Sequence, residues 1–200
     1  MVLRKIIIIL FCLFTFACSN EHKKAENEIL ISKNANIDKD STIEQLNIIR
    51  NKKEHIIQLQ IYKNSKLIKN INFEEVEPLS ATVKSFEEQN ILNTAYNQII
   101  LKLKYKVYGR GESDNTSLFI ISYVSNDFKI VLSYDIERKY HDKVSKYDQY
   151  IKYNYVIKSG EDVKIIFNNI SNVITTKNIN LPKLPTTDIF IWNGQEFVSK

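Results

Sequence analysis

The sequence predicts a mainly β protein, built as an antiparallel meander of hairpins with one or two short helices. In residues 101–107, apolar side chains alternate strictly with lysines, which predicts a strand with one buried and one solvated face. Asn193-Gly194 lies between two apolar segments and is a strong hairpin signal, because both turn positions favour positive φ. Whether the sheet is curled, an open barrel or a sandwich is left open by these patterns.

A short helix is expected before the first clear strands. Ser41-Thr42-Ile43-Glu44 has the spacing of a capping box, and Leu46 and Ile49 follow it at helical spacing. The sequence therefore predicts a helix over residues 42–53.

Period-two patterns dominate the rest of the chain. A first hairpin is expected from residues 57–61 and 67–73, closed off at Pro78, whereas residues 82–97 are ambiguous between helix and strand. Residues 109–115 are expected to form a loop after the strand at 101–107. The later strands, which are expected to pair across short polar turns, are 118–124 with 128–135, 147–157 with 163–167, and 189–192 with 195–198.

The N-terminus has the parts of an export signal. Arg4 and Lys5 precede an apolar stretch, residues 6–17, and a polar run begins at Ser19. Twelve apolar residues are too few for a permanent transmembrane helix, which needs about 20. The stretch is therefore predicted to be a cleaved signal.

Thr15-Phe16-Ala17-Cys18 resembles a lipobox, the cleavage motif of bacterial lipoproteins. The resemblance covers only residues 1–20, and the family prefers Leu where Thr15 stands and a small residue where Phe16 stands. It implies cleavage between Ala17 and Cys18, lipid on Cys18, and anchoring to a membrane of the bacterial envelope. The absence of Asp after Cys18 implies the outer membrane. A general signal peptidase could cut the same bond and leave a soluble periplasmic chain.

Three segments follow from these signals: a signal peptide over residues 1–17, a polar tether over 18–40, and a single β-rich domain over 41–200. Loss of Arg4 and Lys5 lowers the formal net charge from +5 to +3. The lysines are dispersed and do not form a basic stripe, so nucleic-acid binding is not expected. Cys12 and Cys18 are the two cysteines, so the domain is predicted to have neither a disulfide nor a thiol nucleophile.

No motif in the sequence identifies a reaction, a metal or a cofactor. His141 stands beside Asp142 in a segment expected to be a charged connection, and a catalytic pair would also need a nucleophile and an oxyanion site. Asp38 and Asp40 are two residues apart, but nothing near them in the sequence completes a metal shell, so both are expected to be solvated. The chain is therefore expected not to be an enzyme, and no cofactor or metal is predicted.

Tyrosines crowd the last third of the chain. Odd-numbered positions of the predicted strand 147–157 place Tyr147, Tyr153 and Tyr155 on one face together with Ile151. Cross-strand packing is the ordinary reason for tyrosine in a strand. A recognition surface is the alternative, because tyrosine is enriched at protein interfaces.

The functional expectation is a membrane-anchored envelope lipoprotein that binds a protein partner without catalysis, as inhibitor and toxin-immunity lipoproteins do. Its partners would be the membrane, through the N-terminal lipid, and an envelope or secreted protein. Two alternatives remain. The first is a carrier of lipid or small molecules, or a structural component of the envelope. The second is an enzyme with no local motif.

Overall fold

The computed structural model describes residues 27–40, 42–109, 111–144, 147–160, 162–174 and 186–200. Within these residues every regular element is a β-strand, and all paired strands are antiparallel. No helix in this part of the chain is long and apolar enough to cross a membrane. The signal at residues 1–17 and the lipidation site at Cys18 lie outside the described residues.

A small four-stranded sheet comes first in the chain. Its strands follow one another in sequence order and are β1 (Asn27–Ala35), β2 (Glu44–Asn51), β3 (Ile56–Lys63) and β4 (Lys66–Phe73). Asn64 and Ser65 take positive φ in the β3–β4 turn, where the sequence predicts a turn.

A large eight-stranded sheet follows, again with neighbouring strands consecutive in the chain. Its strands are β5 (Thr82–Gln89), β6 (Gln98–Tyr108), β7 (Gly111–Val124), β8 (Asp127–Asp142), β9 (Tyr147–Lys158), β10 (Lys164–Ile174), β11 (Thr187–Trp192) and β12 (Phe197–Ser199). The predicted antiparallel meander is therefore confirmed. The sheet is not closed into a barrel, because β5 and β12 form its two edges.

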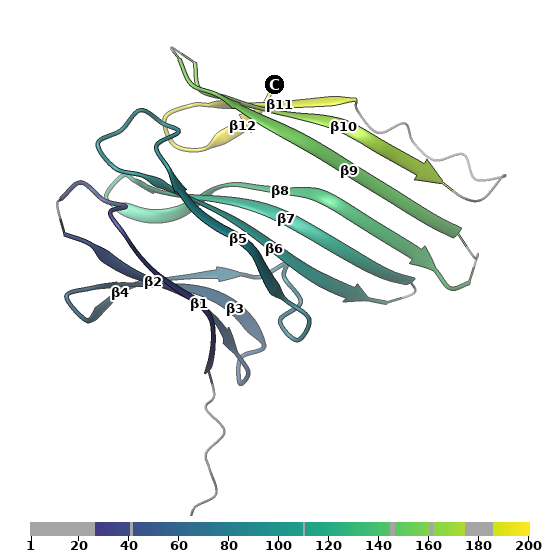
Figure 1. The fold of residues 1–200 in the computed structure, drawn as a ribbon, viewed down its shortest axis with the longest axis horizontal. Helices are drawn as coiled ribbons and strands as arrows, with labels where there is room; N and C mark the ends of the chain where they lie inside the picture. The colour runs from purple at the N-terminus through teal and green to yellow at the C-terminus, as the bar shows by residue number, and fades with distance from the viewer. Residues whose placement is uncertain (1–26, 41, 110, 145–146, 161, 175–185) are drawn as a thin grey trace, which may run out of the picture.

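The large sheet folds back on itself at β9, which produces three layers (Figure 1). Strands β8 and β9 pair only from Glu137 to Asp142, and β9 then leaves β8 to lie with β10–β12 over β6–β8. The small sheet lies on the opposite side of β6–β8.

Each interface between layers has its own core. One cluster joins the small sheet to one face of β6 and β7, and Leu101 and Phe119 belong to it. The other joins the opposite face to β9–β12, and Leu118 and Phe167 belong to it. Because adjacent residues of a strand point to opposite faces, Leu118 and Phe119 serve different cores, and β7 is apolar on both sides.

Two sequence predictions about the N-terminal part are wrong. Residues 44–51 form β2, not a helix, and the inward positions of this strand are Glu44, Leu46, Ile48 and Arg50. Charged residues at both ends of the inward face hid the alternation of period two. The predicted tether is shorter than residues 18–40, since Asn27–Ala35 pairs with β2 as an edge strand.

Two further segments are more regular than the sequence suggests. The predicted loop at residues 109–115 contains the start of β7 at Gly111, and the predicted connection around His141 is the end of β8. The ambiguous segment 82–97 contains strand β5, followed by a loop. The predicted hairpin at Asn193-Gly194 is present, but of these two residues Gly194 alone has positive φ, at 95°, and the second strand begins at Phe197 and not at Gln195.

Candidate binding site

A pocket of about 360 Å³ lies at the ends of β6–β10, next to the β8–β9 hairpin. We call it the β6–β9 pocket. Antiparallel register builds it in rows, because residues opposite one another on neighbouring strands share a face. One row is Glu112, His141 and Asp148. The adjacent row is Lys106, Asp114, Lys139 and Tyr150, with Val173 opposite Tyr150 on β10.

Charges of opposite sign alternate in this pocket. Asp114 faces Lys106, with 3.9 Å between Oδ1 and Nζ, and Glu112 pairs with Lys143. The Lys143 ammonium, by hydrogen bonding, is the main reason why the pKa of Glu112 is lowered. Nδ1 of His141 contacts Oδ1 of Asp148, and both side chains are about half exposed, at 53% and 56%. The pocket therefore offers both donors and acceptors to a ligand.

Tyr150 and Tyr140 are the aromatic residues of the pocket lining, and Tyr150 shares the face of the charged rows. The Tyr150 hydroxyl donates to Oε1 of Glu137 at 3.1 Å, and Nζ of Lys139 lies 5.4 Å from the centroid of the Tyr150 ring. Burial and this bond to Glu137 both raise the pKa of the phenol. The hydroxyl is thus held as a donor to a protein group, while the ring faces the pocket beside Val173.

A hydrolytic arrangement would need a hydroxyl or thiol directed at His141. Ser113 is the pocket-lining serine, and its hydroxyl donates to Oδ1 of Asn115. His141 and Asp148 therefore form a polar pair, and the Ser113 hydroxyl is directed to Asn115 and not to this pair.

The tyrosines singled out from the sequence lie elsewhere. Tyr153 is only 8% exposed and packs against Tyr134, with 5.5 Å between ring centroids. Tyr155 packs on the same core at 5.9 Å from Phe167, so the packing interpretation describes both residues. Tyr147 lies in β9 opposite Asp142 in the register. Neither Tyr153 nor Tyr155 lines the β6–β9 pocket.

Of the residues that form the pocket, sequence reasoning singled out His141 and missed the others. Tyr150 belongs to the tyrosine-rich strand but has even parity, so it points to the opposite face from Tyr153. Lys106 belongs to the segment 101–107, in which apolar residues alternate with lysines, but its neighbours on the adjacent strands depend on how those strands are paired. The alternation in β6 is the sequence signal that could have indicated the pocket, because its lysines mark the face of the sheet on which Lys106 lies.

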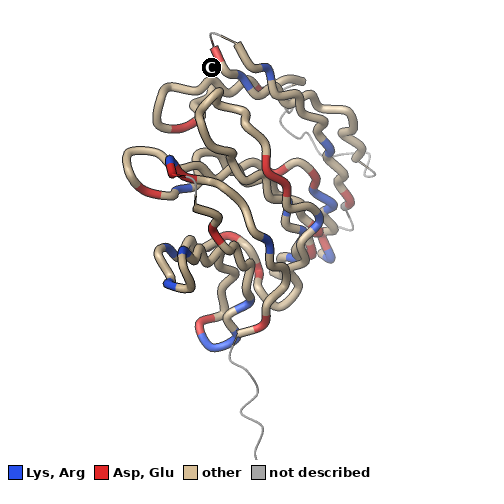
Figure 2. The backbone as a smooth tube through the Cα atoms, turned by 60° about the vertical axis from the view of Figure 1, so that its left-hand side comes forward, with Lys and Arg blue, Asp and Glu red and all other residues tan. Residues whose placement is uncertain are grey.

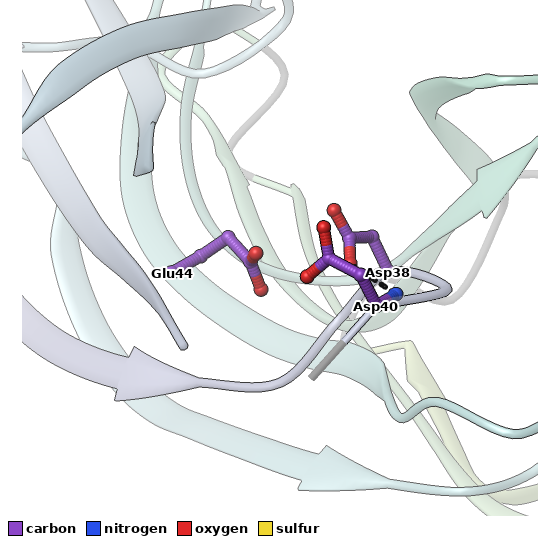
Figure 3. Close-up of side chains that lie close together, drawn as sticks. All are labelled: Asp38, Asp40 and Glu44. Atoms are coloured by element: carbon purple, nitrogen blue, oxygen red, sulfur yellow. Dashed lines mark hydrogen bonds between the residues drawn. The ribbon is translucent and has the colours of Figure 1, made fainter. Parts of the chain in front are cut away.

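A second polar cluster joins the small sheet to its β1–β2 loop (Figure 3). Asp38, Asp40 and Glu44 each direct a carboxylate oxygen to within 4.8 Å of the others. The ammonium of Lys63 contacts all three, with 3.3 Å to Oε1 of Glu44. Glu44 is fully buried and also accepts the backbone N–H of Ile37 at 3.2 Å.

This cluster corrects one expectation about the acidic pair. Asp38 is not solvated as predicted but is only 8% exposed. Hydrogen bonds from Lys63 and from the backbone of Thr42 lower the pKa of Asp40 to about 2. Burial alone would lower the pKa of Lys63, but the three carboxylates outweigh burial and raise it. Carboxylates in this arrangement can bind a divalent cation, yet here the Lys63 ammonium supplies the positive charge between them.

The chain matches no protein-family model, no curated protein and no solved structure.

Proposed function

We propose that this protein is a membrane-anchored binding module of the bacterial envelope, and that the β6–β9 pocket recognises a protein partner. The lipobox-like residues ending at Cys18 support the anchor, and the absence of Asp after Cys18 favours the outer membrane. The tether then runs from Cys18 to β1, which begins at Asn27.

The observation that carries the proposal is the composition of the pocket. Aromatic rings, an aliphatic side chain and charges of both signs lie side by side on five neighbouring strands, β6 to β10. Charges of alternating sign favour a partner with the complementary pattern and disfavour others. Tyrosine supplies apolar contact area at low entropic cost, which is why it is enriched at interfaces. Figure 2 shows the same intermingling of acidic and basic residues along the described part of the chain, where they form no basic stripe.

The alternative functions have less support. A carrier needs an enclosed cavity, whereas the space between β6–β8 and β9–β12 is filled by side chains such as Phe167, Leu118 and Tyr153. An enzyme would need a reactive group beside His141, and Ser113 is engaged with Asn115.

The test is a capture experiment with the full-length tagged chain, expressed in its source cells and extracted from membranes with mild detergent. We expect one envelope or secreted protein to be retained at a near one-to-one ratio. Tyr150→Ala should abolish retention, since it removes the aromatic ring on the face of the charged rows. Tyr62→Ala is the matched control, because Tyr62 is also half-buried but lies on β3 of the small sheet.

Equal retention by Tyr150→Ala and the wild type would move the binding site away from this pocket. Retention of no protein, with lipid in the eluate, would favour the carrier function. In parallel, Cys18→Ser should release the protein from the membrane fraction if lipid on Cys18 is its anchor.

A further inference from the structure

The outward side of the layer β9–β12 carries a continuous aliphatic surface, which we call the outer face. Ile165 and Phe167 of β10 are fully buried, so residues 164, 166 and 168 point away from the core. The same parity applies on the neighbouring strands. The aliphatic members of the outer face are Val156, Ile166, Ile189, Ile191 and Val198.

Strand register makes these five side chains neighbours. Val156 is opposite Ile166, which is in turn opposite Ile189. Ile191, two residues further along β11, is opposite Val198. None of the five belongs to either core cluster, and Val156 and Val198 are 50% and 40% exposed. Single exposed aliphatic residues are ordinary, but a contiguous group across four strands is typical of an interaction surface.

Positive charges border the outer face. Lys158 and Lys164 are opposite each other and lie in the same row as Ile191 and Val198, beside the Val156–Ile166–Ile189 row, and Lys200 follows β12. Asp162 pairs with Lys164 at 3.2 Å, and Asp188 points inward to the hydroxyl of Tyr134. Three lysines, Lys158, Lys164 and Lys200, therefore stand against two carboxylates, Asp162 and the exposed Glu196 before β12, which leaves a small excess of positive charge at the border.

The positive border helps to decide what binds the outer face: a second copy of the chain, the membrane or another protein. A second copy of the chain would bring lysine borders of the same sign together, which is unfavourable across an interface. The membrane is disfavoured by position, an argument that rests on the proposed anchor. Asn27, where β1 begins, lies at the small sheet, on the side of the molecule opposite to β9–β12 (Figure 1). Eight residues, 19–26, lie between Cys18 and Asn27, and the nine steps from Cys18 to Asn27 span at most about 30 Å, so the small sheet is the part held near the bilayer.

We propose that the outer face docks a second protein whose contact surface is apolar with an acidic border. The protein then has two separate recognition surfaces, the β6–β9 pocket and the outer face, and can bridge two partners away from the membrane. The proposal for the outer face stands whether or not the pocket binds a protein.

Photo-crosslinking in the source cells tests this proposal with the full-length chain. The photoreactive residue benzoylphenylalanine replaces Val156, or Leu67 as the control, which is 40% exposed on β4 of the small sheet. We expect one discrete heterologous adduct from position 156 and none from position 67. The crosslinked peptide of the partner should contain Asp or Glu beside apolar residues.

Charge reversal separates this docking from nonspecific contact. Lys158→Glu with Lys164→Glu should lower the yield of the adduct by roughly tenfold, because border charges govern association. Tyr150→Ala should leave the yield unchanged, so failure of the pocket proposal is distinguishable from failure of this one. An adduct of the chain with itself, an adduct with lipid, an adduct insensitive to charge reversal, or no adduct would each overturn the proposal.

Discussion

Nζ of Lys63 lies 3.3 Å from Oε1 of Glu44, a carboxylate that is fully buried. The two residues lie on adjacent strands, β3 and β2, at the end of the small sheet where the β1–β2 loop packs. Asp38 and Asp40 from that loop bind the same ammonium, so Lys63 fixes the loop to the sheet.

Replacing Lys63 by Met should destabilise the fold. The substitution leaves the Glu44 carboxylate buried with only the Ile37 N–H as partner, and breaking a buried pair in this way costs about 3–5 kcal/mol. We expect the lower end of that range, because Lys63 is itself 20% exposed. Urea unfolding of the purified protein measures the loss. Lys69→Met is the control, since the Lys69–Asp127 pair is more exposed and should contribute at most about 1 kcal/mol. Equal effects of the two substitutions would contradict this role for Lys63.

The same cluster predicts a dependence of stability on pH. The pKa of Asp40 is lowered from 3.8 to about 2 in the folded protein. A depressed folded-state pKa contributes stability above the unfolded-state pKa, and that contribution is lost as the pH falls through the folded-state value. The wild type should therefore lose stability between about pH 4 and pH 2, and Asp40→Asn should lose less over the same window. Parallel curves for the two proteins would show that Asp40 is not held by Lys63 in solution.

Truncation of two tyrosines of β9 should lower the stability of the fold by different amounts. Tyr153 is 8% exposed in the core between the layers, so Tyr153→Ala should cost about 3 kcal/mol or more. Tyr150 is only partly buried at the pocket, and Tyr150→Ala should cost no more than about 1 kcal/mol. Thermal or urea unfolding of both variants distinguishes them. A larger loss for Tyr150 would mean that the parity assigned to β9 is inverted.

Gly111 should tolerate no side chain. A Cβ at this position would collide with the backbone oxygen of His141 and lie 2.8 Å from the ring of Tyr140. Gly111→Ala should therefore lower stability by about 1–3 kcal/mol and distort the end of β7, next to the pocket. Gly160→Ala is the matched control, since a Cβ there meets nothing within 4 Å. A silent Gly111→Ala substitution, measured by unfolding and by partner retention, would argue against this close approach of β7 and β8.

The class of fold was predictable because local signals suffice for a meander. The alternation in β6 and the hairpin at Asn193-Gly194 both depend on residues close together in the chain. The strand β6 is confirmed, and the hairpin is confirmed in its position but has a longer turn than predicted. The helix at 42–53 was wrong because Glu44 and Arg50 point inward, where charge is normally excluded. Lys63 on β3 neutralises the buried charge of Glu44, and the backbone oxygens of Pro78 and Ala81 accept hydrogen bonds from Arg50. All three partners are distant in sequence from β2.

The pocket was not predictable for a related reason. Its members lie on different strands, and their proximity depends on the register of β6 to β10, which no local pattern gives. A single shift of parity separates Tyr150 at the pocket from Tyr153 in the core. The folding back of the sheet at β9 likewise depends on where its pairing with β8 ends, after Lys152.

The central claim is that the β6–β9 pocket binds a protein partner. The most direct measurement is the dissociation constant of the captured partner for the wild type, for Tyr150→Ala and for Tyr62→Ala, by isothermal titration of the full-length protein in detergent. The account predicts a weakening of roughly 30-fold or more for Tyr150→Ala, the effect of losing about 2 kcal/mol at an interface centre. Tyr62→Ala should bind as the wild type does. Equal affinity of all three proteins would contradict recognition by this pocket.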